Sequence, residues 1–173
     1  MFGRRKSNRK SKPYTYERSW NYVLWLLGHK AYTKAQLRKK LVSKEAEPEV
    51  VEQVMAKLEE RKFVDDEGFA DMYVRSRQKR KGRIALRREL YQKGVAEEIV
   101  DKTLEPLEAE TQVETAAAIL EKNAWRFRKG DRRKNHAKAY AFLARRGFTG
   151  DVVREALEQV DLSDEAEDSD ILF

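Results

Sequence analysis

The sequence predicts an all-α protein of three tandem three-helix repeats, helix-turn-helix-like in connectivity and forming an elongated, curved array. Apolar residues recur at helical spacing along most of the chain, and no segment shows the alternation of period two that a β-strand needs. The same apolar pattern occurs three times in register. Charged residues make up 39% of the 173 residues, and an array of small modules offers the surface that so much charge requires.

The first repeat is expected at residues 14–65. Its first helix ends near Gly28, and the second begins after Thr33, because Gln36 stands at the capping-box spacing. Pro48 opens the third helix, where its missing N–H leaves no hydrogen bond unmade. The apolar residues of these helices are Trp20, Val23, Leu24, Leu27, Leu37, Leu41, Val51, Val54, Met55 and Leu58.

The second repeat is expected at residues 66–108. Asp65 and Asp66 open its first helix, and Glu67 adds negative charge where the helix dipole favours it. Gly94 is the expected residue just after the second helix. The apolar residues are Phe69, Met72, Tyr73, Leu86, Leu90, Ile99, Val100 and Leu104.

The third repeat is expected at residues 109–161. Thr111 and Glu114 have the capping-box spacing, which predicts a helix start at Thr111, and this helix runs towards Phe127. Gly147 follows the second helix. The apolar residues are Val113, Ala117, Leu120, Ala124, Ala139, Leu143, Val152, Val153 and Leu157.

Five apolar positions of each repeat align with those of the other two. They are Leu37, Leu41, Val50, Val51 and Met55, then Leu86, Leu90, Ile99, Val100 and Leu104, then Ala139, Leu143, Val152, Val153 and Leu157. Gly94 and Gly147 occupy equivalent turns of the second and third repeats, where a left-handed backbone suits glycine. Glu45 holds that position in the first repeat, so we expect its turn to differ.

Composition indicates the class of partner. Lys and Arg number 37 against 30 acidic residues, and the net charge of +7 suits a polyanionic partner or one with acidic patches. Cysteine is absent, which excludes disulfides and thiolate metal sites. The sequence contains no secretory signal and no apolar run of membrane-spanning length, so we expect a soluble, cytoplasmic protein with no membrane partner. Nothing demands a dimer, and a monomer is expected.

Residues 1–13 form a basic arm and residues 162–173 an acidic tail, both with the composition of disordered chain. One interpretation is that both are solvated tails. The other is that the basic arm adds affinity for nucleic acid while the acidic tail competes for it.

Catalytic residues are not indicated. The chain has two histidines, His29 and His136, and no Gly-rich phosphate loop, so we expect no catalytic site, no cofactor and no metal. A metal-dependent nuclease site at Asp65, Asp66 and Glu67 is the alternative. Helix capping explains these acids more simply, since two-metal chemistry uses carboxylates that converge from separate elements.

Two basic blocks are the candidate site, where the first helix of a repeat passes to the second. They comprise Arg75, Arg77, Lys79, Arg80, Lys81, Arg83, Arg87 and Arg88, then Arg126, Arg128, Lys129, Arg132, Arg133, Lys134 and Lys138. Trp125 and Phe127 interleave the second block, a pattern typical of single-strand binding, although an aromatic residue near a helix end is as often part of the core. A solvated face is the alternative, but such faces usually mix charge signs. We expect the blocks to form one cationic strip on the array, facing an anionic partner.

A stand-alone DNA-binding protein or transcriptional regulator is the second functional hypothesis. Each repeat contains a short helix, a turn and another helix, as a DNA-reading helix-turn-helix does. The residues at the start of the would-be recognition helices are Pro48 and Glu49, Glu97 and Glu98, and Gly150 and Asp151. Acidic residues there would repel phosphates, which counts against major-groove reading.

Several stretches resemble the RecX family. The segment Leu58 to Ala70 (LEERKFVDDEGFA) is similar to the signature that joins the first two repeats of RecX proteins, and Tyr73 to Arg77 (YVRSR) continues it. Leu86 to Val95 (LRRELYQKGV) is similar to the second motif of the family, and Leu37 to Leu41 (LRKKL) also fits. The resemblance covers about residues 20–160.

The resemblance implies a non-enzymatic regulator of homologous recombination, DNA repair and the SOS response. RecX proteins bind in the groove of the RecA recombinase filament and generally inhibit its ATPase, strand-exchange and coprotease activities. Weak binding to single-stranded, and in some cases double-stranded, DNA is common in the family. The RecA filament is therefore the expected partner.

This chain departs from the family before the second helix of the second repeat. The family often carries a Gly-Pro pair and then an arginine, whereas here Arg83 follows Gly82 and Ala85 holds the arginine position. We expect a less rigid approach to this helix, with Arg83 and Arg87 replacing the contacts of the missing arginine.

Overall fold

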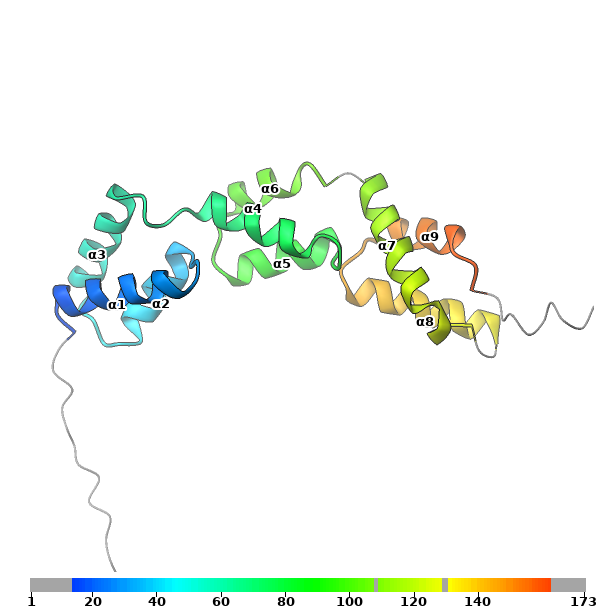
Figure 1. Ribbon diagram of the computed structural model, residues 1–173, viewed down its shortest axis with the longest axis horizontal. Helices are drawn as coiled ribbons and strands as arrows, with labels where there is room; N and C mark the ends of the chain where they lie inside the picture. The colour runs from blue at the N-terminus through cyan, green and yellow to red at the C-terminus, as the bar shows by residue number, and fades with distance from the viewer. Residues whose placement is uncertain (1–13, 108, 129–130, 163–173) are drawn as a thin grey trace, which may run out of the picture. The chain divides into compact units, whose positions relative to one another are not determined.

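A computed structural model describes residues 14–107, 109–128 and 131–162. Within these ranges the chain forms nine α-helices, one short 3₁₀ turn and no strand, grouped as the predicted three tandem three-helix repeats (Figure 1). The helices are α1 (Tyr16–His29), α2 (Lys34–Val42), α3 (Pro48–Glu60), α4 (Asp66–Arg77), α5 (Arg83–Gln92), α6 (Glu97–Leu104), α7 (Ala109–Asn123), η1 (Ala124–Arg126), α8 (Arg132–Arg145) and α9 (Gly150–Gln159). The basic arm 1–13 and the acidic tail beyond Leu162 lie outside the described residues.

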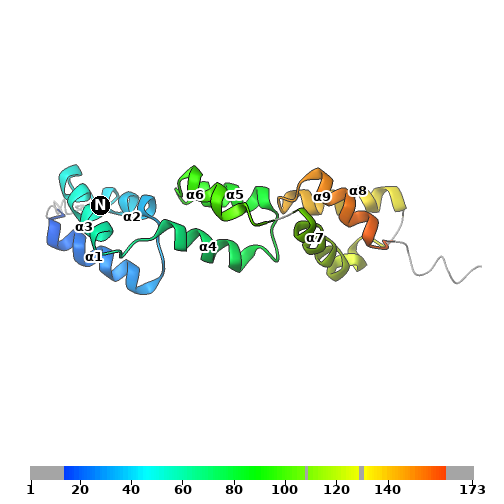
Figure 2. The ribbon, with the colours of Figure 1, turned by 90° about the horizontal axis from the view of Figure 1, so that it is seen from above.

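The three repeats share one packing scheme. The first helix of each lies against the third, in the pairs α1–α3, α4–α6 and α7–α9, and the second helix packs on the third. In the third repeat, α7 and α9 lie side by side in both ribbon views (Figure 2). Each repeat has its own cluster of buried apolar side chains.

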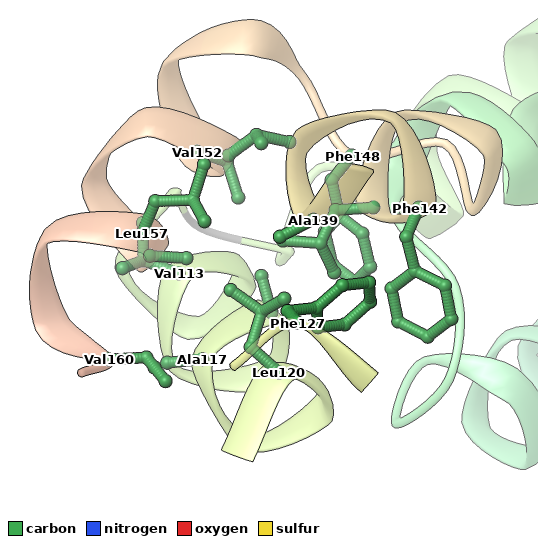
Figure 3. Close-up of a cluster of buried hydrophobic side chains, with 14 residues drawn as sticks. Val113, Ala117, Leu120, Phe127, Ala139, Phe142, Phe148, Val152, Leu157 and Val160 are labelled. Atoms are coloured by element: carbon green, nitrogen blue, oxygen red, sulfur yellow. The ribbon is translucent and has the colours of Figure 1, made fainter. Parts of the chain in front are cut away.

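The core of the third repeat illustrates how these clusters form (Figure 3). Leu120 of α7 and Ala139 of α8 are fully buried, and Phe127 is 5% exposed beside the ring of Phe142, with the two ring centroids 5.3 Å apart. Burying one such large apolar side chain contributes about 1.5–3 kcal/mol. Phe127 therefore belongs to the core and is not available to a nucleic acid, whereas Trp125 is 72% exposed.

The turns that follow α2, α5 and α8 have the same geometry. Gly94 and Gly147 have φ of +77° and +84°, as predicted. Glu45 has φ of +59°, so the expected difference in the first repeat is wrong. In each turn the next residue donates its N–H to a carbonyl five residues back, for example Ala46 to Leu41 at 3.3 Å, which is the hydrogen bond of a Schellman motif.

Two helix starts test the capping signals. Thr33 and Gln36 form the predicted capping box, with the Gln36 N–H donating to Thr33 Oγ1 at 3.2 Å. The second predicted box is wrong, because α7 already begins at Ala109 and Thr111 lies inside its first turn. Among the predicted apolar residues, Leu24 is 36% exposed and Met72 is 51% exposed, so neither is a core residue.

The chain divides into two compact units. The first ends at Asp65 and holds the first repeat, and the second begins at Asp66 and holds the second and third repeats. In the described ranges, every helix is too short or too polar to span a bilayer.

Candidate binding surface

The first basic block surrounds the passage from α4 to α5. Arg75 and Arg77 lie in the last turn of α4, Lys79, Arg80 and Lys81 lie in the connecting turn, and Arg83, Arg87 and Arg88 lie on α5. Arg75, Lys79, Arg80 and Arg88 are exposed, and the other four are partly buried.

Part of this block is neutralised within the second repeat. Glu89, which is 18% exposed, accepts hydrogen bonds from Lys81 and from the Tyr73 hydroxyl, and the Arg77 guanidinium lies 4.0 Å from the centre of the Tyr73 ring. Burial would raise the pKa of Glu89, but the bonds from Lys81 and Tyr73 outweigh it, and the net pKa is lowered. Burial and the bond to Glu89 raise the pKa of Tyr73. Lys81 and Arg77 therefore take part in the structure of the repeat.

The remaining cations differ in their surroundings. Arg87 forms an ion pair with Asp101 of α6. In the part of the chain that the structure describes, five cations have no acidic group within ion-pair distance: Arg75, Lys79, Arg80, Arg83 and Arg88. These five charges are available to an anionic partner.

The turn before α5 contacts the third repeat through its backbone. The Gly82 N–H donates to the Arg146 carbonyl at 2.9 Å, and the Ile84 N–H donates to the Gly147 carbonyl at 3.0 Å. A Cβ atom on Gly82 would collide with the backbone of Gly147, so this approach requires glycine.

Arg83 adds a third hydrogen bond to this junction. Its backbone N–H donates to Oε1 of Gln112 on α7 at 2.9 Å, and Gln112 is only 4% exposed. Ala85 packs against Gly147, where a Cβ atom would overlap it. The approach to α5 thus donates three hydrogen bonds to acceptors in the third repeat, and the expectation that it is less rigid stays a prediction.

Two arginines that were not predicted as site residues lie at this junction, Arg145 and Arg146 at the end of α8. The Arg146 guanidinium lies 3.6 Å from the centre of the Phe142 ring, and that of Arg126 lies 5.3 Å from it. Burial lowers the pKa of Arg146, and the neighbouring charges of Arg126 and Arg145 lower it further. This end of α8 therefore carries a concentrated positive charge.

The second basic block is divided between η1 and the opposite end of α8. Arg126 lies in η1, and Arg132, Arg133 and Lys134 are exposed in the first turn of α8. Cations at this end oppose the helix dipole, each at a cost of about 0.3–1 kcal/mol that a bound anion would relieve. Arg128 is partly buried, and Lys129 lies outside the described residues.

The residues of the second block at the start of α8 lie away from the first block. The 14 residues of α8 extend for about 21 Å, so Arg132 and the Gly82 junction lie at opposite ends of this helix. Lys138 and Arg145, with Arg126 from η1, lie along the interval and line one pocket. Arg145 and Arg146 form an Arg-Arg pair directly before Gly147, and this pair is the sequence signal that could have identified them. Basic residues are common in the last turn of a helix, so the pair is a weak signal by itself.

The acidic residues within the described ranges show no arrangement for metal chemistry. Asp66 begins α4 and is buried, at 9% exposure, and Asp65 precedes it. No three His, Asp or Glu side chains of the described residues lie together as metal ligands. Glu49, Glu97 and Asp151 lie in the first turns of α3, α6 and α9, where they would repel the phosphates of a DNA groove.

Comparison with known proteins identifies relatives along most of the chain. Residues 20–58, 65–104 and 110–157 match the models of the first, second and third three-helix domains of RecX. The regulatory protein RecX of Chlorobium phaeobacteroides is 32% identical over 83% of this chain and 94% of its own length. The regulatory protein RecX of Thermus thermophilus is 38% identical over 78% of this chain and 87% of its own length.

Solved structures agree in fold. The crystal structure of RecX from Lactobacillus salivarius superposes with a TM-score of 0.75 at 24% identity, covering 85% of this chain and 97% of that one. A second crystal structure, of a regulatory protein RecX, has a TM-score of 0.75 at 27% identity, covering 83% of this chain and 73% of that one.

Proposed function

The chain belongs to the RecX family of regulatory proteins, and on that premise we propose that it binds the RecA recombinase filament and inhibits it. The activities inhibited are ATP hydrolysis, strand exchange and coprotease function, so that the protein modulates homologous recombination and the SOS response. It acts as a binder, not as a catalyst, and contacts DNA weakly.

The observation that supports this proposal most directly is the set of uncompensated cations in the second unit. Arg80 and Arg83 lie within two residues of Gly82 in the second repeat, and the Gly82 N–H donates to the carbonyl of Arg146, which follows Arg145 in the third repeat. Charge of one sign destabilises a fold through self-repulsion, and an anionic surface of a nucleoprotein filament would relieve it.

The test is the ATPase activity of the recombinase on single-stranded DNA while this chain is titrated in. We expect suppression at substoichiometric amounts. Replacing Arg75, Arg80, Arg83 and Arg88 by Gln should raise the half-inhibitory concentration about tenfold, because each exposed ion pair contributes about 0.2–1 kcal/mol.

The matched control changes the same number of charges in the first repeat, with Lys39, Lys40, Lys44 and Lys62 replaced by Gln, all of them exposed. It should inhibit nearly as well as the parent chain. Equal losses in both variants would show that only net charge matters, and an ATPase rate unaffected by the parent chain would contradict the proposal. Tight, sequence-dependent binding to duplex DNA without the recombinase would favour a stand-alone DNA-binding protein instead.

A further inference from the structure

A pocket of about 450 Å³ opens between η1 and α8 in the third repeat. Its floor is apolar and consists of Phe127, Phe142, Ala137 and Ala141, and its rim carries Arg126, Lys138 and Arg145. Ala141 leaves the surface of α8 low between Lys138 and Arg145, and Ala137 continues this low surface on the other side of Lys138. An extended chain can therefore lie close to the helix between these two cations.

The three rim cations are uncompensated. No acidic side chain lines the pocket, and none of the described acidic residues lies within ion-pair distance of Arg126, Lys138 or Arg145. Burial of the Arg146 guanidinium is the largest cause that lowers its pKa, and the neighbouring charges of Arg126 and Arg145 lower this pKa further. The pocket thus concentrates positive charge over an apolar floor.

An exposed aromatic ring stands beside this rim. Trp125 is 72% exposed, although a ring of this size is ordinarily packed away from water. The Arg126 guanidinium lies 6.0 Å from the centre of the Trp125 ring and 5.3 Å from that of Phe142, so Arg126 connects the ring to the pocket. An open aromatic face next to cations is the arrangement that holds unpaired bases.

We propose that this pocket is a subsite for single-stranded nucleic acid, in which Arg126, Lys138 and Arg145 bind successive phosphates and Trp125 stacks on an adjoining base. Lys138 and Arg145 are two turns apart on α8, about 10 Å along its axis, which a run of phosphates spans and a single carboxylate does not. The subsite gives the proposed weak DNA contact a location. It does not depend on recombinase binding, because the single strand is bound by this chain alone.

The test is fluorescence anisotropy of a fluorescein-labelled oligothymidine with the full chain, without recombinase, over a range of salt concentrations. Arg145→Gln should weaken binding about three- to tenfold at low salt, because it removes one phosphate contact. The slope of log affinity against log salt should also fall in magnitude by about 0.7, the value for one contact to a single strand. Trp125→Ala should weaken binding about tenfold, with little change in this slope.

Two matched controls isolate the pocket. Lys102→Gln removes a positive charge from an exposed lysine of α6, and Trp25→Ala removes an exposed tryptophan, 59% accessible, from the first repeat. Both should bind the oligonucleotide nearly as the parent chain does. All four substituted side chains are exposed, and circular dichroism should show unchanged folding.

The outcomes separate this subsite from the proposed function. Unchanged affinity and salt slope in Arg145→Gln would overturn the subsite, and so would equal losses in Trp25→Ala and Trp125→Ala. Loss of recombinase binding in Arg145→Gln, with oligonucleotide binding intact, would also overturn it and assign the pocket to an acidic protein surface. Oligonucleotide binding that behaves as expected in a chain that fails to inhibit the recombinase would support the subsite while the proposed function fails.

Discussion

Gly82→Ala is expected to weaken the junction between the second and third repeats. Gly82 has φ of −78° and ψ of 165°, a conformation open to any residue, so the substitution introduces no backbone strain of its own. Its Cβ atom would nevertheless overlap the carbonyl group of Gly147 and the backbone nitrogen of Phe148. Backbone atoms cannot turn aside as a side chain can, so the turn must withdraw from the end of α8.

The loss of stability in Gly82→Ala can be estimated from the hydrogen bonds that break when the turn moves away from the end of α8. They are the two backbone hydrogen bonds of Gly82 and Ile84 and the bond from Arg83 to Gln112. A hydrogen bond contributes about 0.5–1.5 kcal/mol net, so the three together contribute about 1.5–4.5 kcal/mol. Alanine offsets about 0.4–1 kcal/mol of this by lowering the entropy of the unfolded chain. We expect a net loss of about 0.5–4 kcal/mol in the free energy of unfolding of the second unit.

The assay is urea unfolding followed by circular dichroism, combined with hydrogen exchange at the amides of Gly82, Arg83 and Ile84. Gly28→Ala is the matched control, because a Cβ atom on Gly28 meets no atom within 4 Å and alanine favours the helix. Protection of the three amides should fall in Gly82→Ala and stay unchanged in Gly28→Ala. A Gly82→Ala chain as stable as the parent, with these amides still protected, would refute the account of the junction.

Two further predictions concern the capping of α2 and the acid stability of the second repeat. Thr33→Ala should lower the free energy of unfolding of the first unit by about 1 kcal/mol, since it removes the cap of α2, whereas Thr111→Ala, inside α7, should change stability by less than half of that in the same urea titration. A comparable loss in both would contradict the assignment of Thr33 as the cap. The pKa of Glu89 is lowered in the folded state, so its contribution is fully present above the unfolded value of about 4.3 and is lost as pH falls through the folded value. Urea titrations at pH 7 and pH 3 should therefore show a larger acid-induced loss of stability in the parent chain than in Glu89→Gln, and equal losses would contradict the role given to the bonds from Lys81 and Tyr73.

Local signals in the sequence were sufficient for the fold class and for most helix ends. Helical spacing of apolar residues, the capping pair at Thr33 and Gln36, and Pro48 at the start of α3 each act within one or two turns of chain. Gly94 and Gly147 indicated left-handed turns for the same reason. A residue pattern that depends only on its neighbours can be interpreted without knowledge of the packing.

The failures arose where tertiary packing overrides a local preference. A left-handed backbone costs a non-glycine residue about 1–2 kcal/mol, which argued against the common turn at Glu45. The adjacent Ala46 is buried at 9% exposure, and its hydrogen bond to Leu41 repeats the one that closes the other two turns. Packing of the repeat therefore outweighs the strain at Glu45. At Thr111 the capping-box spacing occurs inside a helix, because spacing alone does not distinguish a cap from an interior position.

The candidate site was predicted in part, because a charge run identifies residues but not their neighbours. Arg75 and Arg80 are exposed and uncompensated as expected, whereas Lys81 and Arg87 form ion pairs with Glu89 and Asp101. These acids follow their cations by 8 and 14 residues, a separation that only the helix packing closes. The third repeat adds to the candidate site through contacts between residues still farther apart in the sequence, such as the hydrogen bond from Arg83 to Gln112.

The junction itself explains how this chain accommodates its departure from the family pattern. Proline after Gly82 would set the backbone angle of the turn but would offer no N–H. Arg83 in that position has an N–H, and Oε1 of the buried Gln112 accepts it at 2.9 Å. This hydrogen bond connects the start of α5 to α7, a connection that proline could not make because it has no N–H. Gln112 is therefore the residue of the third repeat that makes arginine at position 83 part of the junction.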